Sequence, residues 1–236
     1  MIARAPDPRA NLVEYPSSDG EPVAETDFHI EELLSFRALL KERYRDAPDV
    51  YAAGNMLVYY EEGNVASRFS PDVFVAFGVP NRMRRVYKIW EEGHAPAFVL
   101  EVSSRGTWLE DAGNKKTLCA RLGVREYFLF DPEDDYLDPP LQGHRLEDGE
   151  YRRIAPEPDG ALRSDVLGLL LRAERLPDRL RLRSIDAATG EALLRIDEEP
   201  RARMTAEARA DAANARAEAA EQEVERLRRL LVGRGG

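Results

Sequence analysis

Four short apolar runs in the middle of the chain have the length and the β-branched or aromatic character of buried strands. They are Met56–Tyr60, Asp72–Phe77, Phe98–Val102 and Glu126–Asp131, the last of which ends at Pro132. Upstream, apolar residues separated by charged ones between Phe28 and Arg45 predict an amphipathic helix.

The segment between the last two of these strands has the signals of a helix. Thr107 followed by Glu110 forms a capping box, and Gly123 is placed as a C-terminal stop, so we expect a helix from about Thr107 to Leu122. A strand, a helix and a strand joined in this way form a crossover, and its two strands are therefore expected to be parallel.

Downstream of a proline-rich break, two turns indicate antiparallel additions. Asp148-Gly149 predicts a hairpin within "HRLEDGEYRRI", and a second hairpin is expected around Thr189-Gly190. The predicted fold class is α/β, with a mixed sheet flanked by helices and extended by antiparallel hairpins.

The two ends of the chain differ from the predicted domain at 27–199. Residues 1–26 hold four of the fifteen prolines and are expected to form a loosely ordered arm. Residues 200–236 contain a heptad seam, with apolar residues at alternating spacings of three and four. The seam consists of Ala210, Ala213, Ala217, Ala220, Val224, Leu227 and Leu231. We favour a self-associating coiled coil and a homodimer over a solvated helix with incidental alanines.

Composition limits the partners and the location of the chain. No run approaches the roughly 18 apolar residues of a membrane span, and the N-terminus lacks the apolar core of a signal peptide. A single cysteine, Cys119, excludes an intrachain disulfide, so a reducing cytoplasm is expected.

The net charge is −10, and residues 200–236 contain eight Arg against six acidic residues, so residues 1–199 carry about −12. Any DNA must therefore bind a local basic patch.

Glu101 is the unusual residue of the predicted strands, because it interrupts the apolar run "FVLEV". Burying an unpaired carboxylate costs several kcal/mol or more. Either the alternation of side chains along the strand places Glu101 on a solvent-exposed face of the sheet, or a cation lies beside it.

Either a divalent cation or a lysine would compensate the negative charge of a buried Glu101. Asp72 begins one predicted strand after Pro71, so pairing with the Glu101 strand would bring both carboxylates to one Mg²⁺ or Mn²⁺ ion, with the Val102 carbonyl alongside. A lysine beside them would orient the attacking water and offset charge on a phosphorane.

Ser103 occupies the natural place for that lysine, two residues after Glu101 on the same strand face. The following helix offers Lys115, which shares a helical face with Leu118 and Leu122 and is therefore expected to point toward the sheet. Lys116, about 100° around the helix, is expected to face solvent.

At these residues the sequence resembles a known family. The segments "SPDVFVAFG", "FVLEVSSRGT" and "DAGNKKTLCARLGVREYFLFDPE" are similar to the PD-(D/E)XK nuclease superfamily and, more narrowly, to the bacterial Uma-type restriction endonucleases. The resemblance covers roughly residues 18–196. It implies a restriction-endonuclease-like fold, Asp72 and Glu101 as metal ligands, and a superfamily lysine moved from position 103 to Lys115.

The resemblance leaves the accessory residues open. An upstream acid is often supplied by the first helix in this superfamily, and Glu25 and Glu32 are candidates, with His29 close by. Ser103 and Asp111 are further candidates for an accessory role.

One dense basic segment is the candidate DNA-binding patch. It contains Arg82, Arg84, Arg85 and Lys88, interleaved with Tyr87 and Trp90. Arginine forks suit phosphate oxygens, whereas the alternative is a solvated loop over packed aromatic rings.

The leading hypothesis is a Mg²⁺- or Mn²⁺-dependent DNA endonuclease with Asp72, Glu101 and Lys115 as its catalytic residues. The rival is a non-catalytic, self-associating binding or scaffold module that keeps the nuclease fold. An RNA-directed nuclease with the same site is not separated from the first by the sequence.

Overall fold

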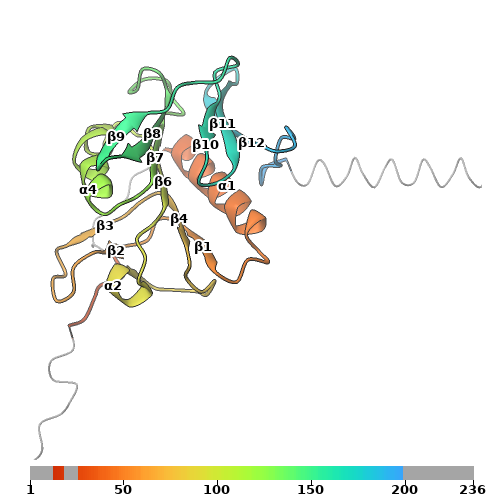
Figure 1. The fold of residues 1–236 in the computed structure, drawn as a ribbon. Coiled ribbons are helices and arrows are strands. Elements are labelled where there is room, and N and C mark those ends of the chain that lie inside the picture. The colour runs from red at the N-terminus through yellow and green to blue at the C-terminus, as the bar shows by residue number, and fades with distance from the viewer. Residues whose placement is uncertain (1–12, 19–25, 199–236) are drawn as a thin grey trace, which may run out of the picture. The chain divides into compact units, whose positions relative to one another are not determined.

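A six-stranded mixed sheet forms the centre of the molecule (Figure 1). The computed structural model describes residues 13–18 and 26–198. The strand order is β1-β4-β6-β7-β8-β9, in which only β6 and β7 are parallel neighbours. The strands are β1 (Val50–Ala53), β4 (Val73–Phe77), β6 (Phe98–Val102), β7 (Glu126–Phe130), β8 (Leu141–Glu147) and β9 (Glu150–Arg153). The predicted mixed sheet and its parallel pair are confirmed.

One face of this sheet is covered by a helix and by a second sheet. The helix is α1 (Asp27–Arg43), which begins where the Thr26 hydroxyl accepts a hydrogen bond from the His29 amide. The second sheet is antiparallel and consists of β10 (Leu162–Ser164), β11 (Leu169–Arg175) and β12 (Leu180–Asp186). Apolar side chains of these layers, including Leu40, Phe98, Phe128 and Leu171, form one buried core.

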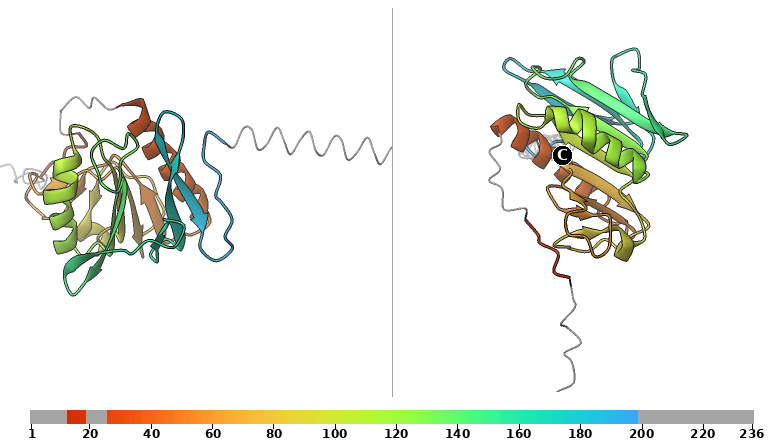
Figure 2. Two further views of the ribbon diagram at one scale, coloured as in Figure 1. Left: turned by 90° about the horizontal axis from the view of Figure 1, so that it is seen from above. Right: turned by 90° about the vertical axis from the view of Figure 1, so that its left-hand side faces the viewer.

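The opposite face carries a three-stranded sheet and the crossover helix. The sheet, in the order β3-β2-β5, contains β3 (Arg68–Phe69), β2 (Val58–Tyr59) and β5 (Tyr87–Lys88), followed by α2 (Ile89–Glu92). The crossover contains α3 (Trp108–Glu110), the π-helical turn η1 (Asp111–Lys115) and α4 (Lys116–Arg121). Figure 2 shows α1 and α4 on opposite faces of the central sheet.

The crossover differs from the predicted regular helix. A π-helical turn interrupts it, and Thr107 does not form the expected capping box. The Thr107 hydroxyl instead accepts a hydrogen bond from the Ser104 amide at 3.2 Å, which closes the loop before the helix. A threonine hydroxyl can form a hydrogen bond with a backbone group of the preceding turn or with one of the helix, and these two bonds compete.

The hairpin predictions have two different outcomes. Asp148 and Gly149 join β8 to β9 with φ angles of 53° and 83°, as a two-residue turn of this sequence requires. Near Thr189-Gly190 the chain also reverses: Ile185 forms an antiparallel bridge with Ala192, and the Asp186 and Leu193 amides donate to the Glu191 and Ser184 carbonyls at 2.8 and 2.9 Å. The second predicted turn is therefore present, but its return segment forms a single bridge rather than a strand.

Residues 13–18, which belong to the expected N-terminal arm, contact the domain. The Tyr15 ring lies 5.0 Å from that of Tyr59 and 5.3 Å from that of Trp90, and its hydroxyl accepts a hydrogen bond from the Gly63 amide. The compact unit ends at Leu193, and the heptad segment lies outside the described residues. Within the described ranges, no helix is both long and apolar enough to cross a membrane.

Candidate functional site

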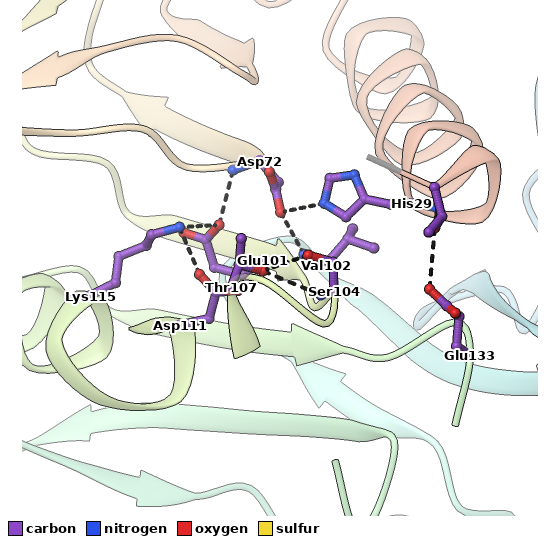
Figure 3. A network of polar contacts seen from close by, with 10 residues as sticks. His29, Asp72, Glu101, Val102, Ser104, Thr107, Asp111, Lys115 and Glu133 are labelled. Atoms are coloured by element: carbon purple, nitrogen blue, oxygen red, sulfur yellow. Dashed lines mark hydrogen bonds and ion pairs between the residues drawn. The ribbon is translucent and has the colours of Figure 1, made fainter. Parts of the chain in front are cut away.

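Asp72 and Glu101 lie side by side at one end of the paired strands β4 and β6 (Figure 3). The Asp72 amide donates a hydrogen bond to Glu101 Oε2 at 3.2 Å. Asp72 Oδ2 in turn accepts one from the Val102 amide at 2.8 Å. Antiparallel pairing of Val73 with Leu100 produces this arrangement, so the sheet brings together the two carboxylates that the sequence had indicated.

Gly54, which follows β1, allows the backbone at Asp72 to take this position. A Cβ atom at Gly54 would lie 2.1 Å from the Asp72 carbonyl oxygen, far inside van der Waals contact. The adjacent Asn55 amide donates to the carbonyls of Pro71 and Asp72 at 3.0 and 3.1 Å. The sequence analysis missed Gly54, since a glycine after a strand carries no chemical signal of its own.

Lys115 is the cation beside Glu101. Its Nζ lies 3.0 Å from Glu101 Oε2 and 2.8 Å from Asp111 Oδ1. Glu101 is fully buried, and Lys115 is only 14% exposed. The buried carboxylate therefore lies within an apolar strand because an inward-facing ammonium from the crossover pairs with it.

The π-helical turn places both Asp111 and Lys115 at this position. Single π turns within α-helices occur frequently at functional sites. Here Asp111 and Lys115 face the sheet, and Cys119 of the following helix is buried against it as well. The sequence predicted the inward direction of Lys115 but not the turn that produces it.

The site holds three acids around one lysine, and their charges oppose one another. Burial raises the pKa of Glu101 well above its ordinary value; Lys115 opposes this rise, while Asp72 and Asp111 add to it. Burial likewise raises the pKa of Asp111. Although burial lowers the pKa of Lys115, the charges of Glu101, Asp111 and Asp72 outweigh that effect and raise it above its ordinary value. The ammonium therefore keeps its proton at neutral pH.

The accessory candidates divide into two groups. His29, which is buried on α1, approaches Asp72, with Nε2 3.3 Å from Oδ2. Ser103 is buried after β6, where its amide donates to the Phe130 carbonyl at 2.7 Å. Glu32 instead accepts a hydrogen bond from the Leu182 amide and so joins α1 to β12. Glu25 lies outside the described residues.

The donor set suits a hard divalent cation. Glu101 Oε1 is buried and has no hydrogen-bond partner among the described residues, so it is a carboxylate oxygen available for a ligand. The same residues include no cluster of three or more His, Cys, Asp or Glu side chains placed to hold a metal. Mg²⁺ nevertheless needs few protein ligands, because it retains several waters in its octahedral shell. Asp72 and Glu101 supply two carboxylates of the kind that Mg²⁺ prefers.

The dense basic segment does not form the expected free phosphate-binding patch. The Arg84 side chain is 2% exposed, pairs with Glu92 at 2.7 Å, and lies over the Tyr51 ring. Arg82 also binds Glu92, and Lys88 pairs with Glu91. Arg85 is exposed. The segment is therefore largely structural, because α2 supplies the acids that neutralise its cations.

Comparison with known proteins identifies the family. The model of the family described as "Uma2: Putative restriction endonuclease" matches residues 3–174, and the chain belongs to this family. A solved structure described as "a putative nuclease belonging to DUF820" from Anabaena variabilis ATCC 29413 is similar to 62% of this chain. It has 14% sequence identity, a TM-score of 0.46 and coverage of 76% of that chain. No curated protein sequence matches the chain.

Proposed function

We propose that this protein is a divalent-metal-dependent DNA endonuclease that hydrolyses phosphodiester bonds. The observation that carries the proposal is the contact of Asp72 with Glu101 on neighbouring strands, with the Lys115 ammonium 3.0 Å from the second carboxylate. Membership of a family named for restriction endonucleases supports the same reaction class. Asp72, Glu101 and the Val102 carbonyl would hold Mg²⁺ or Mn²⁺.

Lys115, Asp111 and His29 would have roles in the reaction other than binding the metal. A bound divalent ion supplies Lewis-acid polarisation of a phosphate oxygen and acidification of water. Lys115, which keeps its proton, suits orientation of the attacking water and stabilisation of negative charge on the phosphorane rather than proton abstraction. Asp111 holds the Lys115 ammonium, and His29 holds Asp72 from the side of α1.

The decisive experiment measures cleavage of supercoiled, linear duplex and single-stranded DNA with Mg²⁺, Mn²⁺ or EDTA. We expect metal-dependent cleavage by the full-length chain and at least a ~100-fold loss in Glu101→Gln and in Lys115→Ala, consistent with removal of a main electrostatic contribution. Glu110→Gln, which alters an exposed acid on α3, is the matched control and is expected to remain active. Full activity of the Lys115→Ala protein would refute the proposed role of that lysine.

A second candidate is a scaffold module without catalytic activity. The observation in its favour is that Lys115 already pairs with both Glu101 and Asp111, so the cluster forms ion pairs without a metal. Binding of Mn²⁺, measured by calorimetry, separates the two functions. A nuclease should bind the ion and lose it in Glu101→Gln, whereas a scaffold needs no such affinity.

A further inference from the structure

A second group of cations lies at the sheet edge next to the crossover, and it is distinct from the basic segment near α2. Lys116 is the first residue of α4 and directly follows Lys115. Arg153 ends the edge strand β9, where it lies opposite His144 of β8. Burial and then Arg153 lower the pKa of Lys116, so the two cations are near enough to repel each other.

Strand register places these residues on the same face as Glu101. His144 lies opposite Tyr127 of β7, and Tyr127 lies opposite Val99 of β6, two residues before Glu101. Side chains alternate along a strand, so Val99 and Glu101 lie on the same face of the sheet. Tyr127 and His144, which lie beside Val99 on the next two strands, therefore belong to that face as well. The Tyr151 ring, two residues before Arg153, lies 6.2 Å from His144 and 5.8 Å from Tyr127, which confirms the shared face.

Neither cation has an acidic partner, in contrast to its neighbours. Among the described residues, neither Lys116 nor Arg153 forms an ion pair, whereas many arginines of the nearby strands and loops do. Those pairs include Arg145 with Glu126, Arg152 with Glu147, Arg163 with Glu157 and Arg172 with Asp159. Two adjacent cations without an acid beside them repel each other. They would be stabilised by a bound anion.

His144 provides a second observation at the same place. Its side chain is more than nine-tenths buried, and Nδ1 has no hydrogen-bond partner among the described residues. Burial and then the charge of Lys116 lower the pKa of His144, while a hydrogen bond to the Tyr127 backbone opposes this shift. Buried polar atoms without a partner are rare in native proteins, and a group bound beside the two cations would supply the missing hydrogen bond.

We propose that Lys116 and Arg153, with His144 beneath them, bind the phosphodiester backbone of the DNA strand that enters the site at Glu101 and Lys115. This inference rests on the proposed nuclease function and identifies where its substrate lies. Three strand spacings of about 4.8 Å separate β9 from β6, so a phosphate held by Arg153 would lie roughly 15 Å from the scissile one. Backbone contacts of this kind fix the register of the nucleic acid and do not read its sequence.

The test is DNA binding rather than cleavage. A short fluorescein-labelled duplex is titrated with the full-length chain in EDTA, by fluorescence anisotropy, over about 50 to 200 mM salt. Lys116→Ala and Arg153→Ala should each weaken binding about 5- to 10-fold. Each should also reduce the slope of log affinity against log salt by about 0.9, the change expected for one lost phosphate contact. Lys116→Arg should retain most of the affinity.

Arg152→Ala is the matched control, because Arg152 lies on the same strand, points to the other face and already pairs with Glu147. It should leave both affinity and slope unchanged. Equal melting temperatures would show that all variants fold.

The possible outcomes separate this proposal from the nuclease assignment. Unchanged slopes in Lys116→Ala and Arg153→Ala, or no DNA binding by the parent chain, would overturn the phosphate-binding site whatever the cleavage result. Reduced slopes without cleavage under any metal would support the binding site and refute the nuclease.

Discussion

At the scale of single residues, the candidate site depends on a backbone contact as much as on its charged side chains. Gly54→Ala should destabilise the fold by about 2–3 kcal/mol, because its Cβ would meet the Asp72 carbonyl at 2.1 Å and force the strand apart. Chemical denaturation measures this loss, and Mn²⁺ calorimetry should show weakened binding as Asp72 shifts. Gly106→Ala, whose Cβ would approach only the Ser104 hydroxyl at 4.0 Å, is the control. Native stability and native Mn²⁺ affinity in Gly54→Ala would contradict this account.

His144 gives the fold a dependence on pH. Burial, together with Lys116 and Arg153, lowers its pKa in the folded protein from 6.5 to about 4. As pH falls from about 6.5 to about 4, the unfolded chain binds a proton that the folded chain does not, so stability falls across this window. One pKa unit corresponds to about 1.4 kcal/mol, so the loss should approach about 2–3 kcal/mol.

Denaturation curves at a series of pH values test this dependence. His144→Gln should flatten the change in stability between pH 6.5 and 4, whereas His94→Gln, at an exposed position, should not. An unchanged profile in His144→Gln would assign the acid sensitivity to other groups.

At the scale of secondary-structure elements, the buried strands with five residues could be predicted from the sequence, and of the two-residue strands only β2 lies within a predicted run, Met56–Tyr60. The strands β4, β6 and β7 have five apolar-rich residues each, enough to show a pattern. By contrast, β3 and β5 have two residues each, which is too short for any periodicity. Their pairing with β2 depends on tertiary contacts such as the packing of Val58, Phe69 and Tyr87 in one core.

The same distinction applies to the chemistry of the elements. The direction of Lys115 followed from the leucines on its helical face, because burial of that face fixes the rotation of the helix. The ion pair of Arg84 could not be predicted from the sequence, because the sequence does not distinguish an arginine that is free from one that has an acidic partner. Its partner, Glu92, is brought to it by α2, eight residues later.

At the scale of the whole molecule, the proposed DNA substrate would carry a charge of the same sign as the protein. The net charge of −10 repels DNA on average, and salt screens such long-range repulsion over about 8 Å at physiological ionic strength. DNA binding would therefore come from short-range contacts with unpaired cations. Lys116 and Arg153 meet this condition under the proposal above, whereas Arg82, Arg84 and Lys88 are paired with Glu91 and Glu92.

The heptad segment supplies the remaining prediction, which concerns assembly. We propose that residues 200–236 pair two copies of the chain, because cutting both strands of a duplex favours two related sites. The seam is alanine-rich at first and strongest at Leu227 and Leu231. Replacing both with Asp should therefore convert a dimer to a monomer, as measured by light scattering. Leu230→Asp introduces the same chemistry one position off the seam and should leave the dimer intact. Equal masses for the parent chain and the double variant would show that these leucines do not join two chains, and each nuclease site would then have to cut without a partner.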